Sequence, residues 1–123
     1  MNEKEMLHNA PIGVFDSGVG GLTVAREIMR QLPNERIVYF GDTARVPYGS
    51  KSPETITRYS SQIVRFLQTQ QVKAIVIACN SASACALETL EEETNLPIID
   101  VVRPGARTAL ETTVNGIIGV IAT

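Results

Sequence analysis

The residue with the clearest chemical potential is Cys79, which follows the apolar run 74–78 and precedes Asn80 and Ser81. The run is typical of a buried strand, and Asn or Ser in the turn is typical of an N-cap before the helix-forming segment 84–93. The dipole of that helix favours a thiolate, the reactive form of cysteine. Cys79 is therefore a candidate nucleophile or base. Free cysteine is also among the most buried residue types, so a core role is an equal alternative.

Asp16 is the second candidate, because it opens the turn DSGVGG directly after the apolar run 11–15. Thr23 stands where a dinucleotide-binding fingerprint needs glycine, and no Lys-Ser or Lys-Thr pair completes a P-loop. Asp16 and Ser17 at the start of the turn suit contacts to a polar ligand. A carboxylate near a thiol can orient it or share its proton, which is acid–base chemistry without a cofactor. Asp is also a common cap of the helix that follows such a turn, and the residues alone leave the acid–base role and the capping role equally open.

Other uses of Cys79 lack a necessary partner. Cys85 stands where a phosphatase loop needs arginine, and the single histidine, His8, lies too close to the N-terminus to serve a cysteine hydrolase. The lysines have no pocket context that suits a pyridoxal phosphate Schiff base. The two cysteines match no zinc or redox spacing, so both are expected to be reduced and unpaired, with Cys85 buried in an apolar helix. We therefore expect no metal and no cofactor.

Strands and helices must alternate along the chain to position these residues. Apolar runs predict strands at 11–15, 36–40, 73–78, 97–102 and 116–121, and helical periodicity predicts helices at 22–32, 53–70, 84–93 and 107–112. The pattern predicts an α/β fold: a parallel sheet of about five strands with helices on both faces, a three-layer sandwich. Ligands collect at the carboxyl ends of such strands. Residues predicted at or just beyond those ends are Asp16, Ser17, Asp42, Tyr48, Cys79, Asn80, Arg103 and Thr123.

Composition limits the classes of partner. The chain has 123 residues, 44% of them hydrophobic, and a formal net charge of −2, which fits one domain with a proper core. Its basic residues are scattered, so we expect no nucleic acid and no membrane surface as partner. The first ten residues mix both charges and lack the apolar region of a signal peptide. They predict a flexible tail, 1–10, before a domain at 11–123, in a cytoplasmic protein.

Three motifs together resemble one known family. They are DSGVGGLTV at 16–24, YFGDTARVPYG at 39–49 and ACNSASA at 78–84. In this order and spacing they look like the N-terminal signatures of glutamate racemases, cofactor-independent enzymes of the aspartate/glutamate racemase superfamily. The resemblance covers nearly the whole chain from Ile12 onward. Ser81 departs from the usual threonine but keeps a hydroxyl, and Val46 occupies a position expected to vary.

The resemblance implies a mechanism. The family interconverts D- and L-glutamate by removing the α-proton with one cysteine and returning a proton from a second cysteine on the opposite face. Cys79 aligns with the base for D-glutamate, and Asp16 aligns with the acidic residue that assists it. The resemblance also implies substrate-binding positions at Asp16, Ser17, Tyr48, Gly49, Asn80, Ser81 and Thr123. The role implied for the family is the supply of D-glutamate for peptidoglycan in the cell wall.

The resemblance also shows what this chain lacks. The family's second cysteine lies in a threonine-cysteine-threonine-histidine segment of a second, similar domain that closes over the first, and that segment does not occur here. Cys85 cannot replace it, because it shares a helix with Cys79. We therefore expect the N-terminal half of a glutamate racemase, with one base and no racemisation by itself. Its expected partners are glutamate and the missing C-terminal domain, and the oligomeric state, a homodimer included, is left open.

Two alternatives remain. The first is a related enzyme of the superfamily, such as an aspartate racemase, or a decarboxylase or isomerase that uses the same thiol. The second is a non-catalytic module that binds an acidic amino acid. The intact pair of Asp16 and Cys79 favours an enzyme.

Overall fold

A single parallel sheet forms the centre of the molecule. The computed structural model describes residues 1–122, so the predicted site residue Thr123 lies outside the described residues. The strands are β1 (Ile12–Asp16), β2 (Ile37–Gly41), β3 (Ala74–Ile77) and β4 (Ile98–Ile99), in the order β2-β1-β3-β4. All described pairs are parallel. The predicted α/β class with a parallel sheet is confirmed.

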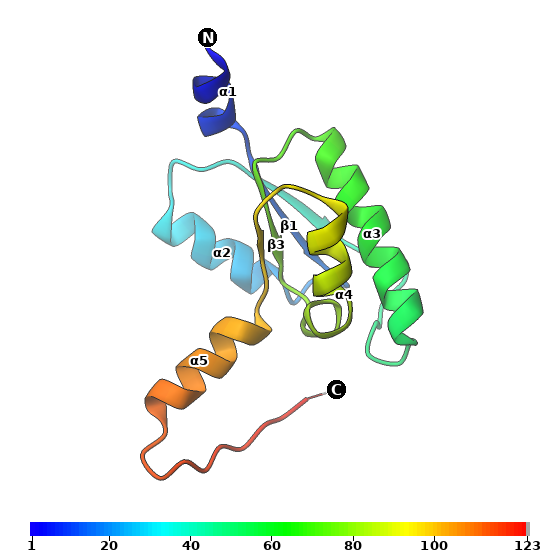
Figure 1. Cartoon of the computed structure of the whole chain (residues 1–123), viewed down its shortest axis with the longest axis vertical. Coiled ribbons are helices and arrows are strands. Elements are labelled where there is room, and N and C mark those ends of the chain that lie inside the picture. The colour runs from blue at the N-terminus through cyan, green and yellow to red at the C-terminus, as the bar shows by residue number, and fades with distance from the viewer. Residues whose placement is uncertain (123) are drawn as a thin grey trace.

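Helices cover both faces of this sheet (Figure 1). On one face, α2 (Leu22–Gln31) packs Val24 and Ile28 against a small core of Ile12, Val14 and Val76. On the other face, α3 (Pro53–Thr69) and α4 (Asn80–Glu93) enclose a larger core. That core includes Phe15, Ile63, Leu67, Ile75, Ile77, Ala86 and Leu90. The two clusters confirm the predicted layers of helix, sheet and helix.

Local chemistry explains where the two larger helices begin. Ser52 caps α3 by accepting a hydrogen bond from the Thr55 backbone N–H, 3.2 Å away, and Pro53 takes the first position, as predicted. The start of α4 was predicted wrongly at residue 84. The helix begins at Asn80, and Cys79 itself is the N-cap, because its sulfur accepts the Ala82 backbone N–H.

The N-terminal segment 1–10, which the sequence predicts to be a flexible tail, contains a short helix. Residues Glu3–Asn9 form α1, whose side chains are all exposed. A capping box starts this helix: Glu5 N–H donates to Asn2 Oδ1 at 2.9 Å, and Asn2 N–H donates to Glu5 Oε2 at 3.0 Å. Lys73, the residue before β3, contacts the end of α1: its Nζ donates to the His8 carbonyl at 2.7 Å.

The fifth predicted strand, 116–121, does not form. After β4 the chain enters α5 (Val102–Thr112), which buries none of its residues, and then turns back as an extended segment (Figure 1). The end of this segment, residues 120–122, lines a hollow with Asn80 and Ser81 but does not join the sheet. Val114 and Ile121 are fully exposed there. A strand requires a neighbour to pair its backbone N–H and C=O groups, and this segment has none among the described residues. The sheet of the described residues therefore has four strands. These residues also contain no helix long and apolar enough to cross a membrane.

We expect the buried face of α4 to carry much of the stability. Leu90 is fully buried in the larger core, so Leu90→Ala should lower the free energy of unfolding by about 2–5 kcal/mol, because it leaves a cavity. Leu110 of α5 is 71% exposed, and Leu110→Ala should stay within about 0.5 kcal/mol of the parent. Urea unfolding of both variants measures the difference. Equal losses would contradict the assignment of the core.

Candidate functional site

The candidate site lies at the topological switch point of the sheet, where successive strands are added on opposite sides of β1. From β1 the chain passes through α2 to β2 on one side, and later enters β3 on the other side of β1. Ligands of open α/β sheets bind at the carboxyl ends of the strands beside this point. Asp16 ends β1, and Cys79 follows β3. The two ends are joined by a hydrogen bond in which Ala78 N–H donates to the Phe15 carbonyl at 2.8 Å.

A hollow of about 440 Å³ opens at this point. Every site residue that the resemblance implies, within the described part of the chain, lines it: Asp16, Ser17, Tyr48, Gly49, Cys79, Asn80 and Ser81. Thr23, Val24 and Val101 also line it and were not singled out from the sequence. The hollow is therefore built from four separate stretches of chain: the turn after β1 with the start of α2, the loop before α3, the segment from the end of β3 into α4, and Val101 after β4.

Cys79 combines the two roles that the sequence left open. Its side chain is 5% exposed and contacts the larger core, yet it lines the hollow. The Ala82 backbone N–H donates to its sulfur at 3.4 Å, from the first turn of α4. An N–H donor and the positive end of a helix dipole both stabilise negative charge on sulfur. The geometry is thus suited to a thiolate that faces a ligand.

Asp16 likewise combines capping with a place in the hollow. Its Oδ2 accepts hydrogen bonds from the backbone N–H groups of Gly18, at 3.2 Å, and Gly21, at 2.9 Å. Gly21 is the N-cap position of α2, so the carboxylate supports the start of that helix. The side chain is 7% exposed and lines the same hollow as Cys79. Capping therefore does not exclude an acid–base role, since it fixes the carboxylate at the site.

Tyr48 is held by a buried carboxylate that sequence reasoning did not connect to it. Its hydroxyl donates to Asp42 Oδ2 in a short hydrogen bond, and Arg45 Nε donates to the same oxygen at 2.7 Å. The Arg45 guanidinium lies 3.9 Å from the centre of the Tyr59 ring. Burial and the Asp42 carboxylate raise the pKa of Tyr48 far above its usual value, so its hydroxyl stays protonated. A ligand would meet the Tyr48 oxygen or the backbone of this loop rather than a free hydroxyl proton.

Arg103, predicted just beyond a strand end, follows β4 but does not line the hollow: it belongs to α5, and its guanidinium lies 3.3 Å from Glu91. The prediction that Cys85 is buried was wrong, because Cys85 is exposed. The buried positions of α4 are Ala82, Ser83, Ala86, Leu87 and Leu90, and their helical spacing places residue 85 outside. Cys79 and Cys85 are both free thiols, as expected. No metal-binding cluster of three His, Cys, Asp or Glu side chains occurs within residues 1–122.

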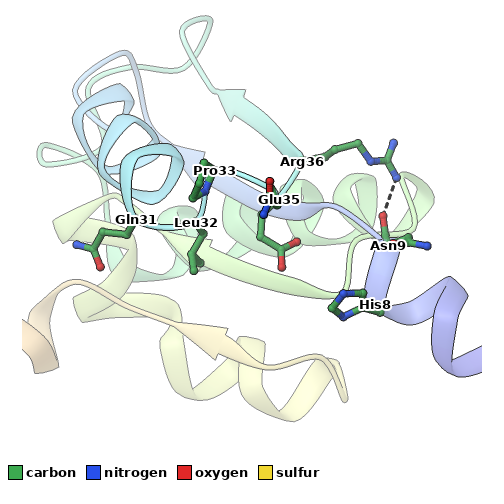
Figure 2. A pocket seen from close by; sticks show the side chains of 8 residues that line it. His8, Asn9, Gln31, Leu32, Pro33, Glu35 and Arg36 are labelled. Carbon is green, nitrogen blue, oxygen red and sulfur yellow. Dashed lines mark hydrogen bonds between the residues drawn. The ribbon is translucent and has the colours of Figure 1, made fainter.

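A larger hollow, of about 690 Å³, lies at the other end of the molecule. Figure 2 shows its lining by His8, Asn9, Gln31 and Arg36, with the Arg36 guanidinium donating to the Asn9 carbonyl at 2.9 Å. It sits at the amino ends of β1 and β2, and contains neither cysteine. The chemistry of the predicted residues therefore identifies the smaller hollow as the candidate site.

Known proteins resemble this chain over most of its length. Residues 12–123 match the family model described as Asp/Glu/Hydantoin racemase. The chain is 59% identical to the glutamate racemase of Geobacter metallireducens over 112 residues, which are 91% of this chain and 42% of that protein. It is 56% identical to that of Lactococcus lactis subsp. cremoris over 117 residues, 95% of this chain and 43% of that protein. The chain thus spans less than half the length of these curated relatives.

Solved structures show the same fold. The glutamate racemase of Thermus thermophilus in complex with β-chloro-D-alanine superposes with a TM-score of 0.79 at 56% identity, over 82% of this chain and 40% of that one. That of Francisella tularensis in complex with D-glutamate superposes with a TM-score of 0.78 at 52% identity, over 81% of this chain and 38% of that one.

We expect the Tyr48 hydroxyl to make stability fall at alkaline pH. Below about pH 10 the tyrosine is protonated in both folded and unfolded chains, and above it only the unfolded chain loses the proton. Because its folded pKa is raised, the free energy of unfolding should fall by about 1.4 kcal/mol per pH unit above pH 10 for this group. Tyr48→Phe should remove this part of the slope, measured by urea unfolding at several pH values. Tyr59→Phe is the control, and an unchanged slope in Tyr48→Phe would contradict the assignment.

Proposed function

Because this chain belongs to the Asp/Glu/hydantoin racemase family, we propose that it carries one of the two bases of a glutamate racemase. The observation that supports the proposal most directly is the meeting of Cys79 and Asp16 in one hollow, from adjacent strand ends. The relatives and solved structures named above supply the substrate class, since they are glutamate racemases at 52–59% identity. The reaction is the interconversion of L- and D-glutamate without a cofactor.

The proposed chemistry is proton transfer at the α-carbon. The Cys79 thiolate takes the α-proton of D-glutamate, and the electron pair of the broken C–H bond remains on the α-carbon as a carbanion. A second thiol on the opposite face then gives a proton to that carbon, which inverts it. The Ala82 N–H and the α4 dipole favour the thiolate before the transfer, and the Asp16 carboxylate, which lines the same hollow, orients the proton.

Substrate binding is proposed for the polar groups of the hollow. Ser17, Asn80 and Ser81 offer hydroxyl and amide groups, and Gly49 offers a backbone N–H beside Tyr48. Such donors suit the carboxylates of a small acidic amino acid and stabilise the charge that develops at the α-carbon. Asp16 and Tyr48 complete the proposed set, and Thr123, outside the described residues, remains a proposed contact.

The second base is proposed to lie in the rest of the protein. The relatives extend well beyond the region they share with this chain, and this chain has no other cysteine in the hollow. We propose that the further part of the protein closes over the hollow from above Cys79. The biological role proposed is the supply of D-glutamate for peptidoglycan, in the cytoplasm, and a homodimer is compatible with it.

Half of the reaction should be observable with this chain alone. In deuterated buffer, D-glutamate should lose its α-proton signal in proton NMR, because Cys79 removes the proton and returns a deuteron to the same face. L-Glutamate should keep its signal, and no net racemisation should occur. Cys79→Ser should lower the exchange rate at least about a hundredfold, since serine is a far weaker acid than cysteine but retains the helix cap.

The matched control is Cys85→Ser, which removes the exposed thiol of the same helix and should leave exchange unchanged. Aspartate, tested in parallel, should exchange more slowly than glutamate, and the reverse order would indicate an aspartate racemase. Exchange that survives in Cys79→Ser, or that is absent from the folded parent chain, would contradict the proposed half-reaction.

A further inference from the structure

Tyr39 and Gly41 lie on the same face of β2, because they are two positions apart. Tyr39 packs against the small core under α2, and its hydroxyl donates to the Gly18 carbonyl at 3.0 Å. Gly18 belongs to the turn that follows Asp16 in the chain. The hydrogen bond therefore joins β2 to the turn of the candidate site across 21 residues of sequence.

Gly41 makes room for the same carbonyl. A Cβ added at Gly41 would lie 2.5 Å from the Gly18 carbonyl oxygen, a distance that real Cβ atoms do not adopt. The turn thus approaches the strand where a side chain is missing, and the neighbouring tyrosine supplies the hydrogen-bond donor there. We call Tyr39 and Gly41 the turn seat.

The turn seat is two hydrogen bonds away from the Asp16 carboxylate. Gly18 accepts from Tyr39 through its carbonyl and donates through its N–H to Asp16 Oδ2 at 3.2 Å. A Cβ added at Gly21, the second donor to Oδ2, would lie 3.0 Å from the Tyr39 hydroxyl oxygen, 2.6 Å from Asp16 Cβ and 2.9 Å from Ala78 Cβ. The side chains of Tyr39, Asp16 and Ala78, the residue before Cys79, therefore all pack closely around Gly21.

We propose that Tyr39 is a positioning residue, which holds the Gly18–Gly21 turn so that the Asp16 carboxylate stays beside Cys79. This inference rests on the proposed function, in which Asp16 assists that thiol. Tyr39 does not line the hollow, so it acts through the turn and not on the substrate.

The ionisation of Tyr39 is consistent with a permanent donor. Burial, the Asp16 carboxylate and the Cys79 thiolate all raise the pKa of Tyr39 above its usual value. The hydroxyl therefore keeps its proton at neutral pH, and the hydrogen bond to Gly18 is retained there.

The test measures the reactivity of Cys79 in this chain. In a Cys85→Ser background, Cys79 is the single thiol, and its alkylation by iodoacetamide at pH 7 is followed by mass spectrometry. Asp16→Asn removes a carboxylate that opposes the thiolate, so alkylation should become faster. Tyr39→Phe removes only the hydroxyl. It should change the rate by about threefold when residue 16 is Asp and leave it unchanged when residue 16 is Asn, because residues that act through one another are not additive.

Tyr59→Phe is the matched control for loss of a phenolic hydroxyl, and should leave the rate unchanged. A purely structural role of Tyr39 predicts the same change with Asp or Asn at position 16, and that result would overturn the proposal. An unchanged rate in Tyr39→Phe with Asp16 present would also overturn it. If Asp16→Asn itself has no effect, the link between Asp16 and Cys79 fails, and the proposal fails with it. The exchange of D-glutamate at Cys79 is tested separately by NMR, so the two failures are distinguishable.

Discussion

The structure depends on how the buried Asp16 carboxylate is satisfied. A carboxylate taken from water needs hydrogen-bond donors, since an unpaired buried charge is strongly unfavourable. At the end of β1 the nearest donors are the backbone N–H groups of its own turn, and the chain must curl tightly to aim two of them at one oxygen. Only a glycine-rich turn can come so close, and β2 must offer space and a donor to receive it. The position of α2, which begins at this turn, follows from the same requirement.

Cys79, which follows the neighbouring strand β3, also has several structural roles at once. One sulfur atom closes the larger core, caps α4 and faces the hollow. Because the N-cap position is fixed by the first turn of the helix, the sulfur has little freedom to move. Catalytic groups that also hold local structure are thereby preorganised, and a ligand does not have to order them on binding.

The sequence was most informative where a pattern is local. Apolar runs located β1, β2 and β3 to within a residue or two, and Ser52 with Pro53 located the start of α3. The rule that ligands meet the carboxyl ends of parallel strands then predicts, from the sequence alone, that Asp16 and Cys79 lie at the same edge of the sheet. The same rule placed Ser17, Tyr48 and Asn80 there, the motifs added Gly49 and Ser81, and all five line the hollow.

The errors arose where partners far along the chain decide the outcome. The contact between Tyr39 and Gly18, and the sharing of Asp42 by Tyr48 and Arg45, cannot be read from spacing alone. Cys85 was predicted to be buried because its neighbours in the sequence are apolar. The packing of α4 against α3 decides which face of α4 is buried, and Cys85 lies on the other face. One local signal was also missed: Asn2 and Glu5 form the capping box that starts α1. The run 116–121 has the composition of a strand and lacks only a neighbour.

That unpaired run has a consequence for handling the chain. Residues 116–121, GIIGVI, carry no charge and no proline, and Ile117, Val120 and Ile121 are largely exposed. Short segments of this kind form intermolecular cross-β contacts, since each copy offers the next a complete set of backbone donors and acceptors. In concentrated solution the first aggregates of the chain should therefore grow through this segment, while the sheet and the hollow above it remain folded.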